Sequence, residues 1–268
     1  MPDTNLTNSI PVINELPNDH ALTIEEQLFS SYLVTVLANE KWHLANLLDD
    51  ALALVVKADG LALRNLSEPK QSDVSVDFLS PALAYRQAKG GGKSELLVKA
   101  IGIKGAADYH VIDATAGLGT DAFVLASAGC QVTMLERSPV VAALLFDALT
   151  RLEQAPANSD WQQRLKLQRG DSVALLSQWP SENTVPDAIY LDPMFPHRKK
   201  SALVKKEMQA LQKLLGVDPD ADALLAPAIA LAKKRVVVKR PASAPYLAER
   251  KPNLSMSSKK HRFDIYLT

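Results

Sequence analysis

Short apolar runs alternate with amphipathic stretches from residue 109 to the end of the chain. A strand buried on both faces reads as a continuous apolar run, whereas a helix packed on a sheet shows an apolar stripe with a 3.6-residue period. The alternation is therefore typical of βα units, and it predicts a mostly parallel sheet covered by helices. The predicted strands are residues 110–114, 131–135, 165–169, 187–191 and 235–239.

The segments between and after these strands also have readable patterns. Residues 120–129 and 138–154 show the helical period, and Ser138 is a suitable N-cap in front of Pro139. After residue 239 a loop with three prolines leads into "HRFDIYLT" at 261–268, which alternates apolar and polar positions. We therefore expect an antiparallel hairpin added to one edge of the sheet.

The first hundred residues follow a different pattern. Residues 52–66 place Asp59-Gly60 between two strand-like runs, which is a strong hairpin signal. Residues 80–103 read as two helical pieces joined by three glycines. We therefore expect residues 1–105 to form a small N-terminal accessory region with a β-hairpin and helices, and residues 106–268 to form the α/β domain that carries the function.

Composition restricts the class of protein. The chain has 268 residues, 47% of them hydrophobic and 22% charged, which is ordinary for a globular protein. Its longest relevant apolar run, residues 223–232, is far shorter than the ~18 residues of a membrane span. Cys130 is the single cysteine, which excludes a disulfide framework and fits a reducing, cytoplasmic location. The sequence contains no Cys/His cluster, so it gives no indication of a metal site.

Charge is unevenly distributed along the chain. The formal net charge is zero, yet residues 193–268 contain 16 Lys and Arg against 6 Asp and Glu. A basic region of this size suggests a polyanionic partner such as nucleic acid, although solvated helix faces would explain the charge equally well.

A glycine-rich turn follows the first predicted strand. In "VIDATAGLGTDAF" (111–123), Gly117 and Gly119 would let a ligand approach the backbone and the start of the next helix. This turn suits NAD and S-adenosylmethionine (SAM) equally. Glu136, at the end of the second strand, can accept both ribose hydroxyls of either molecule, while Asp171 and Ser172 after the third strand favour SAM.

Acidic residues follow each of the first four strands. A single acid after a strand is most often a helix cap, but four in succession are rarely all caps. Because parallel strands end at the same edge of a sheet, these acids would line the edge where open α/β folds bind ligands. They are Asp113, Glu136, Asp171 and Asp192.

The fourth strand leads into "DPMFP" (192–196), which resembles the [DNS]-P-P-[YF] motif of methyltransferases that modify exocyclic amino groups, with Met194 replacing the second proline. The lone pair of such an amine is delocalised into the base. The Asp192 carboxylate and a backbone carbonyl positioned by Pro193 would hold the NH₂ group, while Phe195 would stack on the base. A proline turn with a buried phenylalanine is the competing interpretation.

Basic residues surround this motif in the sequence. A nucleic acid held by its phosphates could present a base to Asp192. The segment "AKGGGKSE" (88–95) is not a phosphate-binding P-loop, because Gln87 stands where its first glycine is required. The candidate RNA contacts are Lys89, Lys93, His197, Arg198, Lys199, Lys200, Lys239 and Arg240.

Several long strings resemble the RsmJ family of bacterial methyltransferases, which modify N2 of a guanosine in 16S ribosomal RNA (rRNA). They include "DATAGLGTDAFVLASAGC", "YLDPMFPHRKKSALVKKEM" and "KRVVVKRP", and the resemblance covers about residues 50–268. It implies a class I SAM-dependent methyltransferase fold, Rossmann-like, with a seven-stranded mixed sheet. The implied products are the methylated base and S-adenosylhomocysteine (SAH), and the implied partner is 16S rRNA or the small ribosomal subunit.

The same resemblance implies a set of cofactor contacts. Thr120 departs from the family, where we expect arginine, so only its backbone contact carries over. The implied contacts are Thr120, Asp121, Glu136, Arg137, Asp171, Ser172 and Asp192.

The remaining alternatives are a methyltransferase acting on an amine of DNA or protein, an NAD-binding oxidoreductase and a non-catalytic RNA-binding protein.

Overall fold

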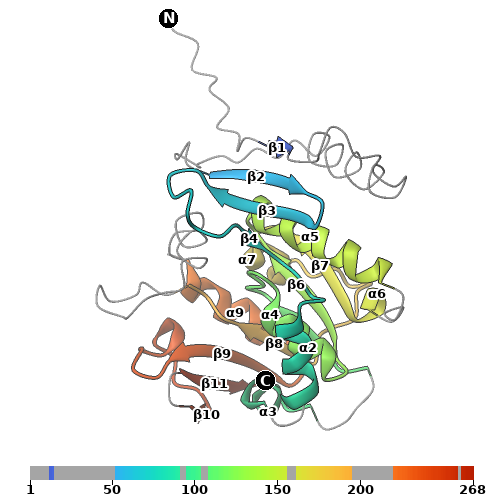
Figure 1. The fold of residues 1–268 in the computed structure, drawn as a ribbon. Coiled ribbons are helices and arrows are strands. Elements are labelled where there is room, and N and C mark those ends of the chain that lie inside the picture. Colours follow the sequence, from blue (N-terminus) through green and yellow to red (C-terminus); the bar gives the residue numbers. More distant parts are fainter. Residues whose placement is uncertain are drawn as a thin grey trace, which may run out of the picture. The chain divides into compact units, whose positions relative to one another are not determined.

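The computed structural model describes residues 12–14, 52–90, 95–103, 108–155, 161–194, 220–258 and 261–268. The described residues fall into two compact units, which are treated separately below. The first contains a four-stranded sheet and the first turns of one helix; the second contains a seven-stranded sheet and most of the helices (Figure 1). The predicted division of the chain after residue 105 stays a prediction.

The small sheet of the first unit has the strand order β1-β2-β3-β4. Its strands are β1 (Val12–Asn14), β2 (Leu52–Lys57), β3 (Gly60–Asn65) and β4 (Val74–Ser75). The antiparallel pairing of β2 with β3 confirms the predicted hairpin. The turn differs by one position, because Lys57 pairs with Gly60 and residues 58 and 59 therefore form the turn.

Gly60 is required at the start of β3 for two reasons. Its φ of +123° lies in a region that side-chain-bearing residues rarely adopt. A Cβ atom there would lie 2.7 Å from Arg151 Nε and 2.8 Å from Oδ2 of Asp147, which is fully buried. The hairpin therefore packs closely against α5 (Pro139–Gln154) within the first unit.

The large sheet has the order β10-β11-β9-β8-β5-β6-β7. The strands are β5 (His110–Asp113), β6 (Gln131–Glu136), β7 (Leu165–Arg169), β8 (Ala188–Leu191), β9 (Arg235–Pro241), β10 (Leu254–Ser257) and β11 (His261–Leu267). The five strands from β5 to β9 pair in parallel, whereas β11 runs antiparallel to both β9 and β10. The five predicted strands, the edge hairpin and the seven-stranded mixed sheet are thereby confirmed.

The chain order reverses at the centre of this sheet. From β5 the chain proceeds outward through β6 and β7 and then returns to β8 on the other side of β5. Connections from β5 and β8 therefore leave in opposite directions, and the carboxyl edge at such a reversal point is where open α/β folds bind ligands.

Helices lie before and between the strands of the large sheet in the sequence. The predicted helices are present as α2 (Pro81–Gly90), α3 (Leu96–Ile101), α4 (Thr120–Ser127) and α5. The sequence pattern did not identify α6 (Trp161–Arg164), α7 (Ser172–Ser177), α9 (Leu225–Leu231) or the 3₁₀ turns η1 (Ala221–Leu224) and η2 (Leu247–Glu249). In the described part of the chain, no helix is long and apolar enough to cross a membrane.

One core cluster fixes the central strands in place. Ile112, Ile189 and Val236, on β5, β8 and β9, are fully buried and pack with α7, η1 and α9. Since burial of one such side chain stabilises the fold by about 1.5–3 kcal/mol, this cluster makes the centre of the sheet a rigid support for the loops that follow it.

Candidate functional site

The turn between β5 and α4 presents an open backbone surface. Gly117 and Gly119 have φ angles of +52° and +71°, and Gly119 is the N-cap of α4. A Cβ atom at Gly117 would meet nothing closer than the Thr115 carbonyl oxygen at 3.9 Å. The backbone at Gly117 is therefore not covered by another described part of the chain.

Glu136 ends β6 beside this turn and is only 6% exposed. Its Oε2 accepts a hydrogen bond from the Gly117 amide at 3.1 Å, and its Oε1 accepts one from the Ser138 amide at 2.7 Å. The carboxylate is thus held between two loops.

The third acid, Asp171, has a structural role of its own. It is the N-cap of α7, and its Oδ1 accepts a hydrogen bond from the Ala174 amide at 2.9 Å. Ser172 follows it and donates from Oγ to the Ala114 carbonyl oxygen at 2.7 Å. This bond fixes the start of α7 to the end of β5, so the third loop belongs to the same edge as the first.

The fourth acid, Asp192, directly follows β8. Its amide donates a hydrogen bond to Oγ1 of Thr115 at 2.6 Å, which attaches the start of "DPMFP" to the glycine-rich turn. Its Oδ2 accepts a bond from Nζ of Lys239 at 2.8 Å. The same ammonium group donates to Oδ2 of Asp121 at 2.9 Å, and the Tyr190 hydroxyl donates to that oxygen at 2.7 Å.

Burial changes the ionisation of these acids. Loss of water contacts, together with the nearby Asp121 charge, raises the pKa of Asp113 to about 8. The same loss of water raises the pKa of Asp192, although Lys239 acts in the opposite direction. Lys239 stays charged, because the two carboxylates raise its pKa despite partial burial. Near pH 7 the site therefore holds a neutral Asp113 beside a paired Lys239.

Two predicted contacts have other partners in the structure. Arg137 forms an ion pair with Asp220, with Nη1 3.0 Å from Oδ1. Arg240 is 3% exposed and donates from Nε and Nη2 to the Pro245 carbonyl oxygen at 2.9 and 2.6 Å. Its geometry is that of a loop anchor and does not support the predicted phosphate contact.

Lys239 reaches the same edge as Asp192, as the position of its strand implies, and has carboxylate partners there. The sequence grouped it with the RNA contacts, whereas its ammonium group lies between Asp121 and Asp192. Thr115 and Tyr190 were not identified from the sequence at all. A hydroxyl next to an acid at a strand end carries no distinctive motif, so only the folded geometry shows these two contacts.

Part of the predicted site lies outside the described residues. Pro193 is buried, and Thr120 is exposed at the first position of α4. Lys89 belongs to α2, but its side chain is outside the described part of the structure. The predicted residues that lie wholly outside it are Lys93, Phe195, His197, Arg198, Lys199 and Lys200.

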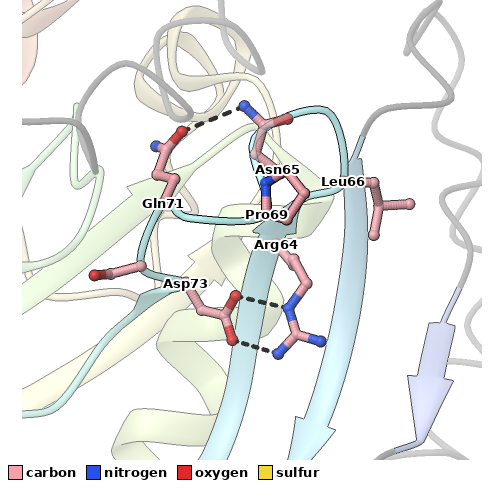
Figure 2. A pocket seen from close by; sticks show the side chains of 7 residues that line it. Arg64, Asn65, Leu66, Pro69, Gln71 and Asp73 are labelled. Carbon is pink, nitrogen blue, oxygen red and sulfur yellow. Dashed lines mark hydrogen bonds and ion pairs between the residues drawn. The ribbon is translucent and has the colours of Figure 1, made fainter.

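A pocket of about 410 Å³ lies in the first unit, on the loop between β3 and β4 (Figure 2). Its arginine, Arg64, makes a two-pronged ion pair with Asp73 at 2.8 and 2.7 Å, and Asn65 donates to Gln71. None of the predicted cofactor residues lines this pocket. Among the described residues, no group of His, Cys, Asp and Glu side chains could hold a metal ion.

The order of the seven strands, with acids at the carboxyl edge of the sheet, defines the fold of a class I methyltransferase. A family model described as "Putative SAM-dependent methyltransferase" matches residues 37–268. A solved SAM-dependent methyltransferase from Neisseria gonorrhoeae is 34% identical, with a TM-score of 0.68 over 96% of this chain and 95% of that one.

Curated relatives narrow the family further. The chain is 59% identical to ribosomal RNA small subunit methyltransferase J of Pseudoalteromonas atlantica, over 81% of this chain and 85% of the relative. The protein of that name from Haemophilus ducreyi is 52% identical, over 85% and 90%. The chain therefore belongs to the ribosomal RNA small subunit methyltransferase J family of SAM-dependent methyltransferases, as the resemblance predicted.

The raised pKa of Asp113 predicts a pH-dependent stability. The folded protein keeps the proton up to about pH 8, whereas the unfolded chain releases it near 3.8, so stability falls as pH rises between these values. Asp113→Asn removes this loss. We expect its unfolding free energy, relative to the unsubstituted protein, to rise with pH by up to about 1.4 kcal/mol per unit.

Urea denaturation from pH 5 to 8 without cofactor measures this difference. Asp59→Asn is the matched control, because the Asp59 side chain is 79% exposed, and its difference from the unsubstituted protein should stay flat. A flat difference for Asp113→Asn as well would show that Asp113 is ionised throughout this range in the folded protein.

Proposed function

We propose that this chain transfers a methyl group from SAM to the exocyclic N2 of a specific guanosine in 16S rRNA. The observation that carries the proposal is the placement of Asp192, which directly follows β8 at the reversal point of the sheet and is held by Thr115 and Lys239. The relatives named as methyltransferases of small-subunit rRNA support the substrate class. Such a substrate implies a cytoplasmic location.

The residues at the carboxyl edge fit the cofactor. The open Gly117 surface would accept the amino-acid end, and Glu136 would accept the ribose hydroxyls while remaining fixed by its two backbone bonds. When bound, SAM supplies an activated methyl group on its sulfonium and leaves as SAH. The proposed cofactor contacts are Asp113, Gly117, Gly119, Thr120, Asp121, Glu136, Arg137, Asp171, Ser172 and Asp192.

Asp192 would orient the amine of the base. Its Oδ2 is occupied by Lys239, and among the described residues its Oδ1 forms no hydrogen bond, so Oδ1 can accept one from the N2 amino group. That bond draws the nitrogen lone pair out of conjugation with the ring and directs it toward the methyl group. As the new C–N bond forms, the amine loses one proton, which Asp192 can accept. The proposed catalytic residues are Asp192, Pro193 and Phe195.

The basic segment after the motif would hold the RNA backbone. His197, Arg198, Lys199 and Lys200 follow Asp192 so closely in the chain that phosphate contacts there would place a base near the carboxylate. Lys89 and Lys93 would add contacts from the glycine-rich connection between α2 and α3. These contacts are proposed from the sequence.

The proposal is tested with unmodified 16S rRNA and with small subunits that lack the modification. The purified protein and labelled SAM should yield one N2-methylguanosine, which nuclease digestion and mass spectrometry would locate. The two substrates also distinguish free rRNA from an assembled subunit. Methyl transfer to DNA or protein, with none to either rRNA substrate, would contradict the proposal.

Asp192→Asn should nearly abolish turnover. The substitution keeps the size of the side chain but loses the negative charge and can place an NH₂ donor against the amine. We expect the turnover number to fall about 10²-fold or more at saturating cofactor and RNA. Asp187→Asn is the matched control, because Asp187 lies at the amino end of the same strand and is paired with Lys234. Normal turnover in Asp192→Asn would place the catalytic residues elsewhere.

Replacing Arg198, Lys199 and Lys200 together with alanine should weaken RNA binding but not SAH binding. Three lost phosphate contacts should reduce the slope of log affinity against log salt by about 2 to 3 units. Fluorescence anisotropy with labelled rRNA fragments at several salt concentrations measures the slope. The matched control replaces three exposed lysines near the amino ends of β7 and β9, namely Lys166, Lys233 and Lys234. Equal slopes for both variants would exclude the proposed contacts.

A further inference from the structure

Lys239 occupies an unusual position for a residue expected to bind RNA. It lies on β9, one residue beyond the pairing of Leu191 with Val238, and its side chain is 28% exposed. Its Nζ is 2.9 Å from Oδ2 of Asp121 and 2.8 Å from Oδ2 of Asp192. Charge-assisted hydrogen bonds of this length are about twice as strong as neutral ones, so the two carboxylates hold the ammonium group in place.

Several titratable groups lie near Asp192 and Lys239, and they influence the protonation state of Asp192. Asp121, at the start of α4, and Tyr190, on β8, face the same ammonium or its partners, and Asp113 ends the neighbouring strand. His261 and Phe263 share a face of the sheet with Lys239, because β11 pairs Phe263 with Lys239 and His261 with Pro241.

The charges of these groups do not act in the same direction. Asp121 favours the protonated form of Asp192, whereas Lys239 and, more weakly, His261 favour the ionised form. Lys239 is the only one of these groups that bonds directly to the Asp192 carboxylate within the described residues. Without it, a partly buried carboxylate beside a second acid would take up a proton.

We propose that Lys239 is a positioning residue, which keeps the Asp192 carboxylate ionised and turned so that Oδ1 faces the substrate amine. This inference rests on the proposed function and gives Lys239 a role in place of the predicted phosphate contact. Two bonds fix the acid: the Thr115 hydroxyl oxygen holds its backbone amide, and Lys239 holds Oδ2. An ionised Oδ1 can both accept the hydrogen bond of the amine and take its proton.

Carbon-13 NMR of the aspartate carboxyl groups tests the electrostatic part without any substrate, with Asp192→Asn to assign the signal. In Lys239→Met the titration of Asp192 should move up by about 1 to 3 pH units, because a bonded positive charge is lost. In Asp121→Asn it should move down, because a negative neighbour is removed. Lys239→Arg should leave it near the original position.

Lys234→Met is the matched control, since Lys234 lies one residue before β9 and is paired with Asp187 at the other edge of the sheet. It should leave the Asp192 titration unchanged. If Lys239→Met does not fold, the downward shift in Asp121→Asn and the unchanged titration in Lys239→Arg decide: a titration that fails to move down in Asp121→Asn would overturn the proposal. Unchanged titration in a folded Lys239→Met would overturn it as well.

The pH profile of turnover tests the positioning part. At saturating rRNA and SAM, the acid limb of Lys239→Met should shift upward by the same amount as the NMR titration, so that a higher pH restores part of the lost turnover. SAH affinity at that pH, measured by calorimetry, should fall less than threefold. An unshifted limb would contradict the role of Lys239.

The two proposals fail in different ways. If the unsubstituted protein methylates no rRNA while the NMR shifts occur, the proposed function is wrong and Lys239 still controls the Asp192 carboxylate. If rRNA is methylated and neither the titration nor the acid limb moves, the proposed function stands and the inference about Lys239 is wrong.

Discussion

The parallel pairing of β5 with β6 on one side and β8 on the other is the constraint on which the site depends. Three strands that run in the same direction must deliver their connections to one edge, and the reversal of chain order at β5 separates two of those connections. Acids that lie 20 to 80 residues apart in the sequence are thereby brought together. The buried apolar side chains of β5, β8 and β9 supply the rigidity that keeps them there.

Grouping acids at one edge has an electrostatic cost, which is offset in three ways in this structure. Glu136 receives two backbone amides, Asp171 caps a helix, Asp192 is paired with Lys239, and Asp113 keeps its proton until about pH 8. A hydrogen bond, an opposite charge and neutralisation are thus the three ways in which the carboxyl groups at this edge are stabilised. Because the acids are held in this way, the edge can persist in the absence of a ligand.

The sequence was sufficient to predict most of the second unit because its signals are local. Apolar runs marked the five parallel strands, the two glycines marked the open turn, and the acids stood at the strand ends. The small helices were missed, since α7 has six residues and offers too few positions for a 3.6-residue period to show. The hairpin turn was displaced by one residue, because only packing against Asp147 and Arg151 places Gly60 inside the strand.

Lys239 and Arg240 show the limit of reading charge from sequence. Lys239 and Arg240 are consecutive residues of β9, so their side chains point to opposite faces of the sheet. This geometry argues against the shared RNA contact that the charges alone suggested. One side chain meets Asp121 and Asp192, and the other anchors the loop that follows β9 through the Pro245 carbonyl oxygen. Their charges are therefore paired with acceptor groups of the protein itself.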